Sequence, residues 1–146
     1  CGVTTSVATK NNDDGVDKTV DALKERFSGL IFTNLVDFDS KYGHRRNIEG
    51  YAKAIEDFDR RLPEIMEAMN DEDILIICAD HGNDPAYQGF NHTREFVPLL
   101  VYGKNVRSGV NLGIRDTFSD VAASVCDYLG VRDTGAGISF IKEIME

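Results

Sequence analysis

An apolar run followed at once by Asp80 and His81 is the part of this sequence with the clearest capacity for chemistry. The run, Ile74 to Ala79, is continuous, and the Asp-His pair stands at its carboxyl end. A short continuous apolar run is typical of a buried strand, and open α/β sheets carry their chemistry at the carboxyl ends of their strands. The pattern therefore predicts a strand that delivers two metal-binding side chains to one edge of a sheet.

Further metal-binding side chains follow a second apolar run. Asp37, Asp39 and His44 lie in the polar loop after it, and His92 lies at the far end of the loop that begins at Asp80. If both strands belong to one parallel sheet, the two loops open on the same side. Imidazole with carboxylate suits Mn²⁺, Zn²⁺ or Fe. Five or more ligands suffice for two ions about 4 Å apart, an arrangement that serves phosphoryl transfer.

Structural roles compete with these assignments. A single Asp after a strand often caps a helix, and a single loop His is often solvated. Spacing does not rank Asp37 against Asp39, since both could reach the sheet edge. Arg45, Arg46 and Arg94 could grip a phosphate through paired hydrogen bonds, but such arginines more often neutralise acidic neighbours, and we favour that role.

Strand and helix patterns alternate along the chain. Loose alternation predicts a strand over Val3–Ala8, and apolar runs predict strands over Leu30–Val36, Ile74–Ala79 and Phe96–Tyr102. Helical spacing predicts helices over Val16–Phe27, Ile48–Met69 (bent or divided by Pro63), a third from Thr117 to Gly130, and one turn within Ser139–Glu146. This alternation predicts an α/β fold with a mostly parallel sheet and helices on both faces.

Composition narrows the class of protein. A chain of 146 residues suits one domain, and a net charge of −9 argues against nucleic-acid binding. No apolar stretch approaches the roughly 20 residues of a membrane span. The three cysteines are odd in number and form no Cys-x-x-Cys pair, which favours a reducing, cytoplasmic compartment. We expect Cys78 and Cys126 to be core residues.

Four motifs carry a resemblance to a known family. They are NLVDFD at 34–39, YGHRR at 42–46, DHGNDP at 80–85 and HTRE at 92–95. In order and spacing they resemble the phosphopentomutases of the alkaline phosphatase superfamily. The resemblance implies interconversion of ribose 1-phosphate and ribose 5-phosphate, and of the deoxyribose equivalents, through two metal ions, typically Mn²⁺, and a phosphorylated threonine.

The resemblance also assigns the metal ligands. It implies that Asp80 and His81 bind the first ion, and that Asp39, His44 and His92 bind the second. It prefers Asp39 over Asp37, because the distances of Asp39 to His44 and Asp80 along the chain match the family pattern.

The resemblance covers only the C-terminal part of the family's core domain. We therefore expect residues 1–146 to be an incomplete alkaline-phosphatase-like core, a fragment that lacks the nucleophilic threonine and the cap domain and is inactive alone. The first residue, Cys1 rather than Met, favours that view. An uncovered sheet edge would favour self-association. The alternatives are a cofactor-independent phosphoglycerate mutase or a phosphatase of the same superfamily, or a non-catalytic metal-binding module.

Overall fold

The computed structural model describes residues 2–132 and 135–145, which divide into two compact units. The first unit comprises residues up to Arg26, Ile31–Met69 and His81–Val97, and the second comprises Phe27–Leu30, Asn70–Asp80 and the residues from Pro98 onward. The described helices include none that is both long and apolar enough to cross a membrane.

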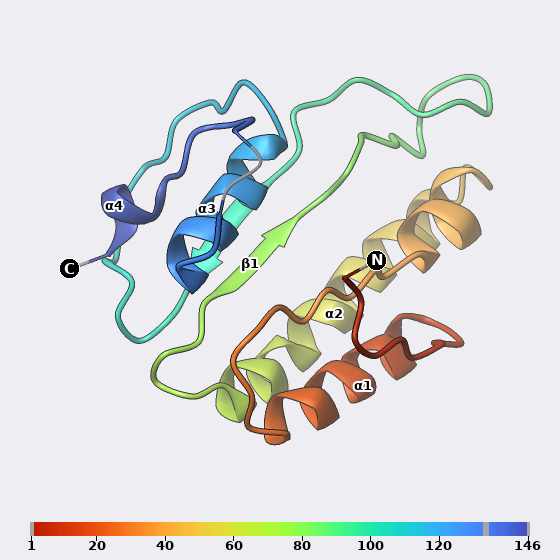
Figure 1. The fold of residues 1–146 in the computed structure, drawn as a ribbon. Coiled ribbons are helices and arrows are strands. Elements are labelled where there is room, and N and C mark those ends of the chain that lie inside the picture. Colours follow the sequence, from red (N-terminus) through yellow and green to blue (C-terminus); the bar gives the residue numbers. More distant parts are fainter. Residues whose placement is uncertain (1, 133–134, 146) are drawn as a thin grey trace. The chain divides into compact units, whose positions relative to one another are not determined.

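Helices make up the regular structure of the first unit: α1 (Asn12–Lys24), the π-helix η1 (Phe38–Gly43) and α2 (Ile48–Ala68). Asn11 caps α1, because its side-chain oxygen accepts from the backbone N–H of Asp14. Helices α1 and α2 lie side by side (Figure 1), and Val16 and Ile65 are buried. The spacing of apolar residues thus predicted both helices.

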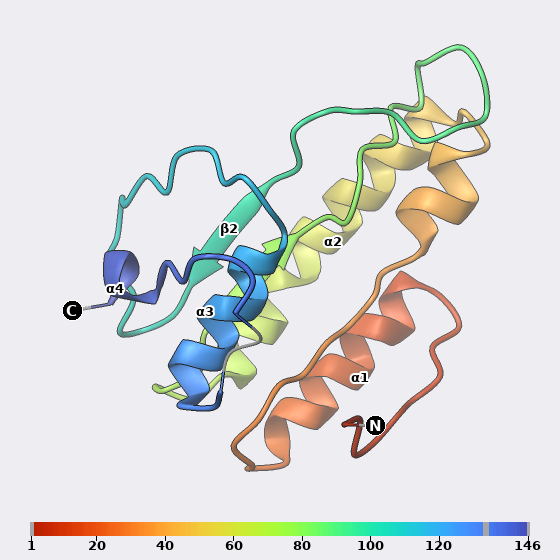
Figure 2. The same ribbon diagram turned by 45° about the horizontal axis from the view of Figure 1, so that its top comes forward.

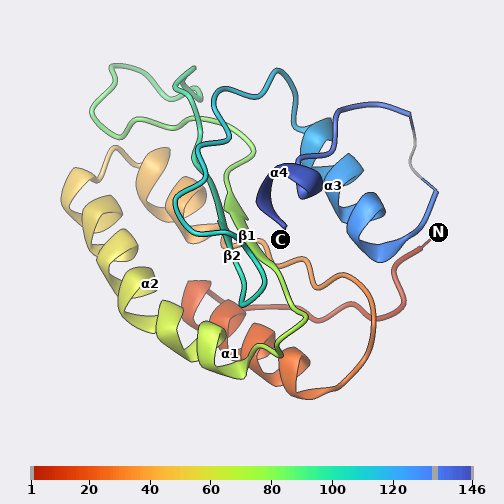
Figure 3. The ribbon, with the colours of Figure 1, turned by 90° about the vertical axis from the view of Figure 1, so that its left-hand side faces the viewer.

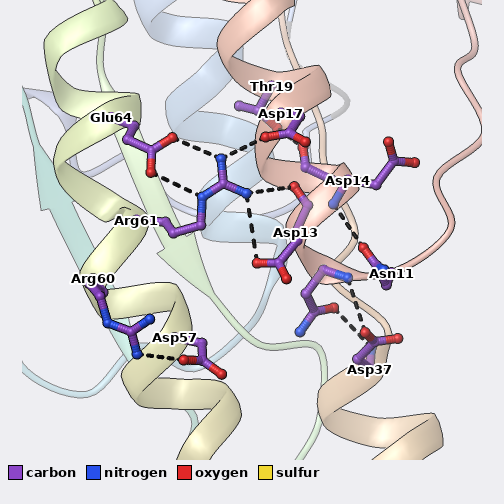
Figure 4. Close-up of polar contacts among 12 residues, drawn as sticks. Asn11, Asp13, Asp14, Asp17, Thr19, Asp37, Asp57, Arg60, Arg61 and Glu64 are labelled. Carbon is purple, nitrogen blue, oxygen red and sulfur yellow. Dashed lines mark hydrogen bonds and ion pairs between the residues drawn. The ribbon is translucent and has the colours of Figure 1, made fainter.

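Arg61 links α1 to α2. Its guanidinium donates to the Asp13 carbonyl at 2.9 Å, to Asp17 Oδ1 at 2.6 Å and to both carboxylate oxygens of Glu64 (Figure 4). The hydrogen bond from Arg61 lowers the pKa of the Glu64 carboxyl. Since these acidic groups are exposed, the network fixes the helix pair in position more than it adds stability.

Pro63 was expected to bend or divide helix α2; α2 is continuous across it, so the helix is not divided. Asn47 caps the helix by accepting from the N–H of Gly50 at 2.9 Å. The ring of Pro63 removes only one donor from the ladder. The apolar positions repeat at helical spacing on both sides of it, from Ala54 to Ile65, and their burial outweighs that loss.

The second unit contains a small sheet and two helices. Its strands are β1 (Leu75–Cys78) and β2 (Leu99–Tyr102), and its helices are α3 (Ser119–Leu129) and α4 (Ile141–Ile144). The two strands lie side by side (Figure 3). They pair antiparallel, with Leu75 opposite Tyr102 and Cys78 opposite Leu99. Gly130 ends α3 with a φ of 64°, in the left-handed conformation that glycine adopts without strain.

Ser124 is the polar centre of the second unit's core. It is 0% exposed, its hydroxyl donates to the Asp120 carbonyl at 2.7 Å, and it accepts from the N–H of Phe140 at 2.9 Å. The Asp120 carboxylate accepts from the Ile138 N–H at 2.9 Å and from Arg115 at 2.8 Å. These two bonds, the backbone one first, lower the pKa of Asp120.

The fold agrees with the sequence in class and differs in the sheet. A mixed α/β chain is confirmed, but the described sheet has two antiparallel strands, and the mostly parallel sheet is not seen. Residues 3–8 and 30–36 form no strand. Within the described ranges no neighbouring strand pairs with these two segments. Val3 and Phe32 are accordingly 82% and 83% exposed.

The predictions for the cysteines, the third helix and the tail had different outcomes. Cys78 is exposed and Cys126 is only half-buried, so the expectation that both are core residues is wrong. The third helix begins at Ser119, after Thr117, whose hydroxyl oxygen accepts from the Ser119 N–H at 3.2 Å. A helical turn does lie within the tail, at Ile141–Ile144, and Glu146 lies outside the described residues.

Candidate metal centre

Two loops of the first unit bring together one carboxylate and three imidazoles. Asp39 and His44 come from η1 and its C-terminal end, and His81 and His92 come from the segment His81–Val97, which passes the start of α2 (Figure 2). His92 Nε2 lies 3.0 Å from His44 Nε2 and 3.3 Å from Asp39 Oδ1. His44 Nε2 lies 3.3 Å from Asp39 Oδ2.

His81 completes the group. Its ring stacks on that of His92, with centroids 3.7 Å apart, and one ligand atom each of Asp39, His81 and His92 lie within 4.8 Å of one another. The side chains of Asp39, His44 and His92 are 35%, 37% and 46% exposed, so small ions have access to them.

The spacing of these donor atoms fits a divalent cation. Metal–nitrogen bonds of about 2.1 Å at tetrahedral or octahedral angles place two ligands of one ion about 3.0–3.4 Å apart. His44 Nε2 and His92 Nε2 lie 3.0 Å apart, and each lies 3.3 Å from an oxygen of the Asp39 carboxylate, His44 from Oδ2 and His92 from Oδ1. Imidazole nitrogens and a carboxylate together suit Mn²⁺, Zn²⁺ or Fe.

The π-helix explains the five-residue spacing between Asp39 and His44. The N–H of His44 donates to the carbonyl of Asp39 at 2.9 Å, the i to i+5 bond that defines a π turn. This wide turn places both side chains on one face, whereas an α-helix would separate positions i and i+5 around its axis. Isolated π turns recur at functional sites.

A backbone carbonyl fixes the tautomer of His44. Its Nδ1 lies 2.7 Å from the carbonyl oxygen of Phe90, which can only accept. The proton therefore resides on Nδ1, and in the neutral ring Nε2 presents its lone pair to Asp39 and His92. A second ring nitrogen bound to a carbonyl is the usual support of a metal-ligating histidine.

Asn83 supports the carboxylate, and sequence reasoning missed it. Its side-chain amide donates to Asp39 Oδ1 at 2.6 Å, and the residue is 8% exposed. It approaches over Gly43, where a Cβ would meet Asn83 Nδ2 at 2.4 Å. The available signal was the position of Asn83 inside the DHGNDP turn, directly after His81 and Gly82.

The aspartates that the spacing left unranked have different surroundings. Asp37 is 7% exposed, exchanges hydrogen bonds of 3.0 Å with Asn12, and accepts from Lys41 at 3.0 Å, so its carboxylate holds η1 to the start of α1. Asp37 thus has structural contacts, whereas Asp39 lies beside His44 and His92.

Asp80 belongs to the second unit. The pKa of the Cys78 thiol is raised, first by the burial of that thiol and second by the charge of Asp80. The role of Asp80 as a ligand stays a prediction.

Other polar residues near the group have structural contacts. Thr93 donates to Glu95 at 2.5 Å and accepts from the Asp84 N–H at 2.7 Å. Burial, followed by the charges of Asp39 and Glu95, raises the pKa of Tyr51. Arg45 and Arg94 are exposed.

Comparison with known proteins agrees with this chemistry. The sequence model of the metalloenzyme superfamily matches residues 1–133 of this chain. A phosphopentomutase of Alkaliphilus metalliredigens is 55% identical over 145 residues, which are 99% of this chain and 37% of that protein. The phosphopentomutase of Clostridioides difficile is 57% identical over 139 residues, 95% of this chain and 36% of its own length.

A third relative, the phosphopentomutase of Kosmotoga olearia, is 56% identical over 145 residues, 99% of this chain. The chain spans about 37% of the length of the curated relatives that it matches. The match to the family description covers most of the chain, including every donor of the candidate centre. The chain belongs to the metalloenzyme superfamily.

Proposed function

We propose that this chain is the metal-binding part of a phosphopentomutase, an isomerase that interconverts ribose 1-phosphate and ribose 5-phosphate and their deoxyribose equivalents. The observation that carries the proposal is the gathering of the Asp39 carboxylate with His44 Nε2 and His92 Nε2, which lie 3.0 Å from each other and 3.3 Å from its two oxygens. The identity of 52–57% to proteins named phosphopentomutase supports the choice of reaction.

The residues that would hold the ions are Asp39, His44, Asp80, His81 and His92, and we propose two Mn²⁺. Bound divalent ions supply positive charge that polarises phosphoryl oxygens and lowers the cost of charge that develops during transfer. Neutral imidazoles contribute no charge, so among these five ligands only Asp39 and Asp80 offset the charge of the ions.

The protein's own groups prepare the centre. The Phe90 carbonyl holds His44 with its Nε2 lone pair inward, and the Asn83 amide holds one oxygen of Asp39. Both bonds orient the ligand atoms, and ligands held in this way need little reorganisation on binding.

The nucleophile is proposed to lie outside this chain. Thr93 stands beside His92, but its hydroxyl is engaged by Glu95 and by the Asp84 backbone, which supports a structural role. We therefore propose that the chain alone does not turn over substrate. A chain that is about 37% of the length of its relatives agrees with that view.

Two finer features belong to the same proposal. The short antiparallel pair β1–β2 would be one edge of a larger, mostly parallel, alkaline-phosphatase-like sheet. The compartment would be the cytoplasm, on the strength of the odd cysteine count and the free thiols of Cys78 and Cys126.

A substrate panel tests the proposal. The full-length protein is loaded with Mn²⁺ and offered ribose 1-phosphate, deoxyribose 1-phosphate, 2-phosphoglycerate and p-nitrophenyl phosphate. We expect isomerisation of the two pentose phosphates, loss of activity in Asp39→Asn, and wild-type activity in Asp116→Asn, which removes the same charge from an exposed position.

Preference for 2-phosphoglycerate would point to a mutase of glycerate phosphates, and hydrolysis of p-nitrophenyl phosphate alone would point to a phosphatase. Turnover of ribose 1-phosphate by the purified 146-residue chain would contradict the inactivity proposed for it.

A further inference from the structure

We propose that Arg46 is a positioning residue of the metal centre, which acts through the Asn83 amide on Asp39 and through the Phe90 carbonyl on His44. The proposal rests on the proposed metal-binding function of these ligands. It replaces both roles that the sequence left open for Arg46, the grip on a substrate phosphate and the neutralisation of acidic neighbours.

The guanidinium of Arg46 is fully committed to uncharged acceptors. Nη1 donates to Asn83 Oδ1 at 2.9 Å and to the Asp84 carbonyl at 2.8 Å. Nη2 donates to the Asn91 carbonyl at 2.8 Å, and Nε donates to the carbonyl of Gly89. All three nitrogens are thus occupied, and no paired edge is left for a bidentate grip on phosphate.

Arg46 decides which way the Asn83 amide points. A guanidinium has only donors, so the atom of Asn83 that faces it must be the carbonyl oxygen. The NH₂ group is thereby turned to Asp39 Oδ1, 2.6 Å away. Without Arg46 the amide loses the partner that fixes this orientation, and a flipped amide would set its oxygen against the Asp39 carboxylate.

The second path runs through the loop beside His92. Arg46 binds the carbonyls of Gly89 and Asn91, the residues on either side of Phe90. The carbonyl of Phe90 in turn accepts from His44 Nδ1 at 2.7 Å. One side chain therefore holds the partners of both the carboxylate and the imidazole.

The backbone of Arg46 carries a cost that this arrangement explains. Its φ of 53° is the one positive value among the described residues other than glycine. A long side chain in the left-handed region is disfavoured, and such conformations persist where surrounding contacts hold them, often at functional sites. The four hydrogen bonds of the Arg46 guanidinium are contacts of that kind.

Metal binding by the full-length protein tests this role. Three variants are compared with the wild type: Arg46→Gln, Asn83→Leu and the matched control Arg45→Gln, which removes the same charge from the adjacent exposed residue. The readouts are the Mn²⁺ dissociation constant by calorimetry, the visible absorption of the Co²⁺-loaded protein and the melting temperature by circular dichroism.

We expect Arg46→Gln and Asn83→Leu each to weaken Mn²⁺ binding about 10- to 100-fold, the usual effect of removing an outer-shell partner. We expect both to alter the Co²⁺ spectrum at temperatures where circular dichroism shows a folded protein. A purely structural role would lower the melting temperature and leave the spectrum of the folded, Co²⁺-saturated variant unchanged. Arg45→Gln should match the wild type in all three readouts.

The outcomes separate this inference from the function on which it rests. Loss of Mn²⁺ affinity in His44→Ala, with Arg46→Gln equal to Arg45→Gln, would overturn the inference and leave the proposed centre standing. If Arg46→Gln does not fold, Asn83→Leu decides alone, and wild-type Mn²⁺ affinity and Co²⁺ spectrum in that variant would overturn the inference. A Mn²⁺ affinity of His44→Ala equal to that of the wild type would overturn both the inference and the proposed metal centre.

Discussion

Gly43→Ala is expected to damage the metal centre without touching any ligand. Gly43 is buried, and a Cβ added there would lie 2.4 Å from Asn83 Nδ2, 2.7 Å from Asn83 Cγ and 3.0 Å from the Phe38 carbonyl. Ordinary contact begins near 3.4 Å, so the Asn83 side chain must retreat by about 1 Å.

That displacement is large compared with the bond it disturbs. Asn83 Nδ2 lies 2.6 Å from Asp39 Oδ1, and a retreat of about 1 Å stretches the separation to about 3.6 Å, beyond hydrogen-bond length. We expect Mn²⁺ affinity to fall about 10- to 100-fold. Overpacking costs about 1–3 kcal/mol, which lowers the melting temperature by about 3–10 °C.

The assay is Mn²⁺ calorimetry beside a melting curve by circular dichroism. The matched control is Gly29→Ala, where the nearest atom is 3.2 Å away on the ring of Phe27, an exposed side chain that is free to turn. Wild-type Mn²⁺ affinity together with an unchanged melting temperature in Gly43→Ala would refute the packing of Asn83 over this glycine and its hold on Asp39.

Further predictions concern stability and association. Ser124→Ala should cost about 1–3 kcal/mol by urea unfolding, because it strands the buried Phe140 N–H, whereas Ser108→Ala at an exposed position should be neutral. The pKa of Asp120 is lowered in the folded protein, so the unfolded chain binds this proton more tightly and the contribution of Asp120 to stability is lost as pH falls below the unfolded pKa of about 3.9. Asp120→Asn should therefore flatten the dependence of melting temperature on pH in the acid range, and an equally steep profile would contradict this. The exposed Leu100 and Tyr102 of β2 favour self-association, so light scattering at high concentration should detect oligomers, and a strict monomer would count against it.

The helices were predictable because their signals are local. Apolar spacing located α1, α2 and α3, and Gly130 marked the end of α3. The alternation at 3–8 and the apolar run at 30–36 predict strands, but a strand depends on a neighbouring strand with which it can form hydrogen bonds. The spacing of apolar residues does not show whether that neighbouring strand is present, or whether it runs parallel.

The candidate centre was predictable in its donors and not in its supports. Histidine is rare in this chain, so His44, His81 and His92 could be singled out by type, and the family resemblance preferred Asp39 to Asp37. The roles of Asn83 and Arg46 depend on which atoms meet across about forty residues of sequence. The π turn that aligns Asp39 with His44 has no simple sequence signature either.

Electron spin echo spectroscopy of the Mn²⁺-loaded chain tests whether side chains from the two loops share metal ions. We expect nitrogen modulation from coordinated imidazole, weakened in His44→Ala and in His92→Ala and unchanged in Asp116→Asn. Mn²⁺ bound without any nitrogen coupling, or coupling that survives both histidine substitutions at full strength, would contradict it.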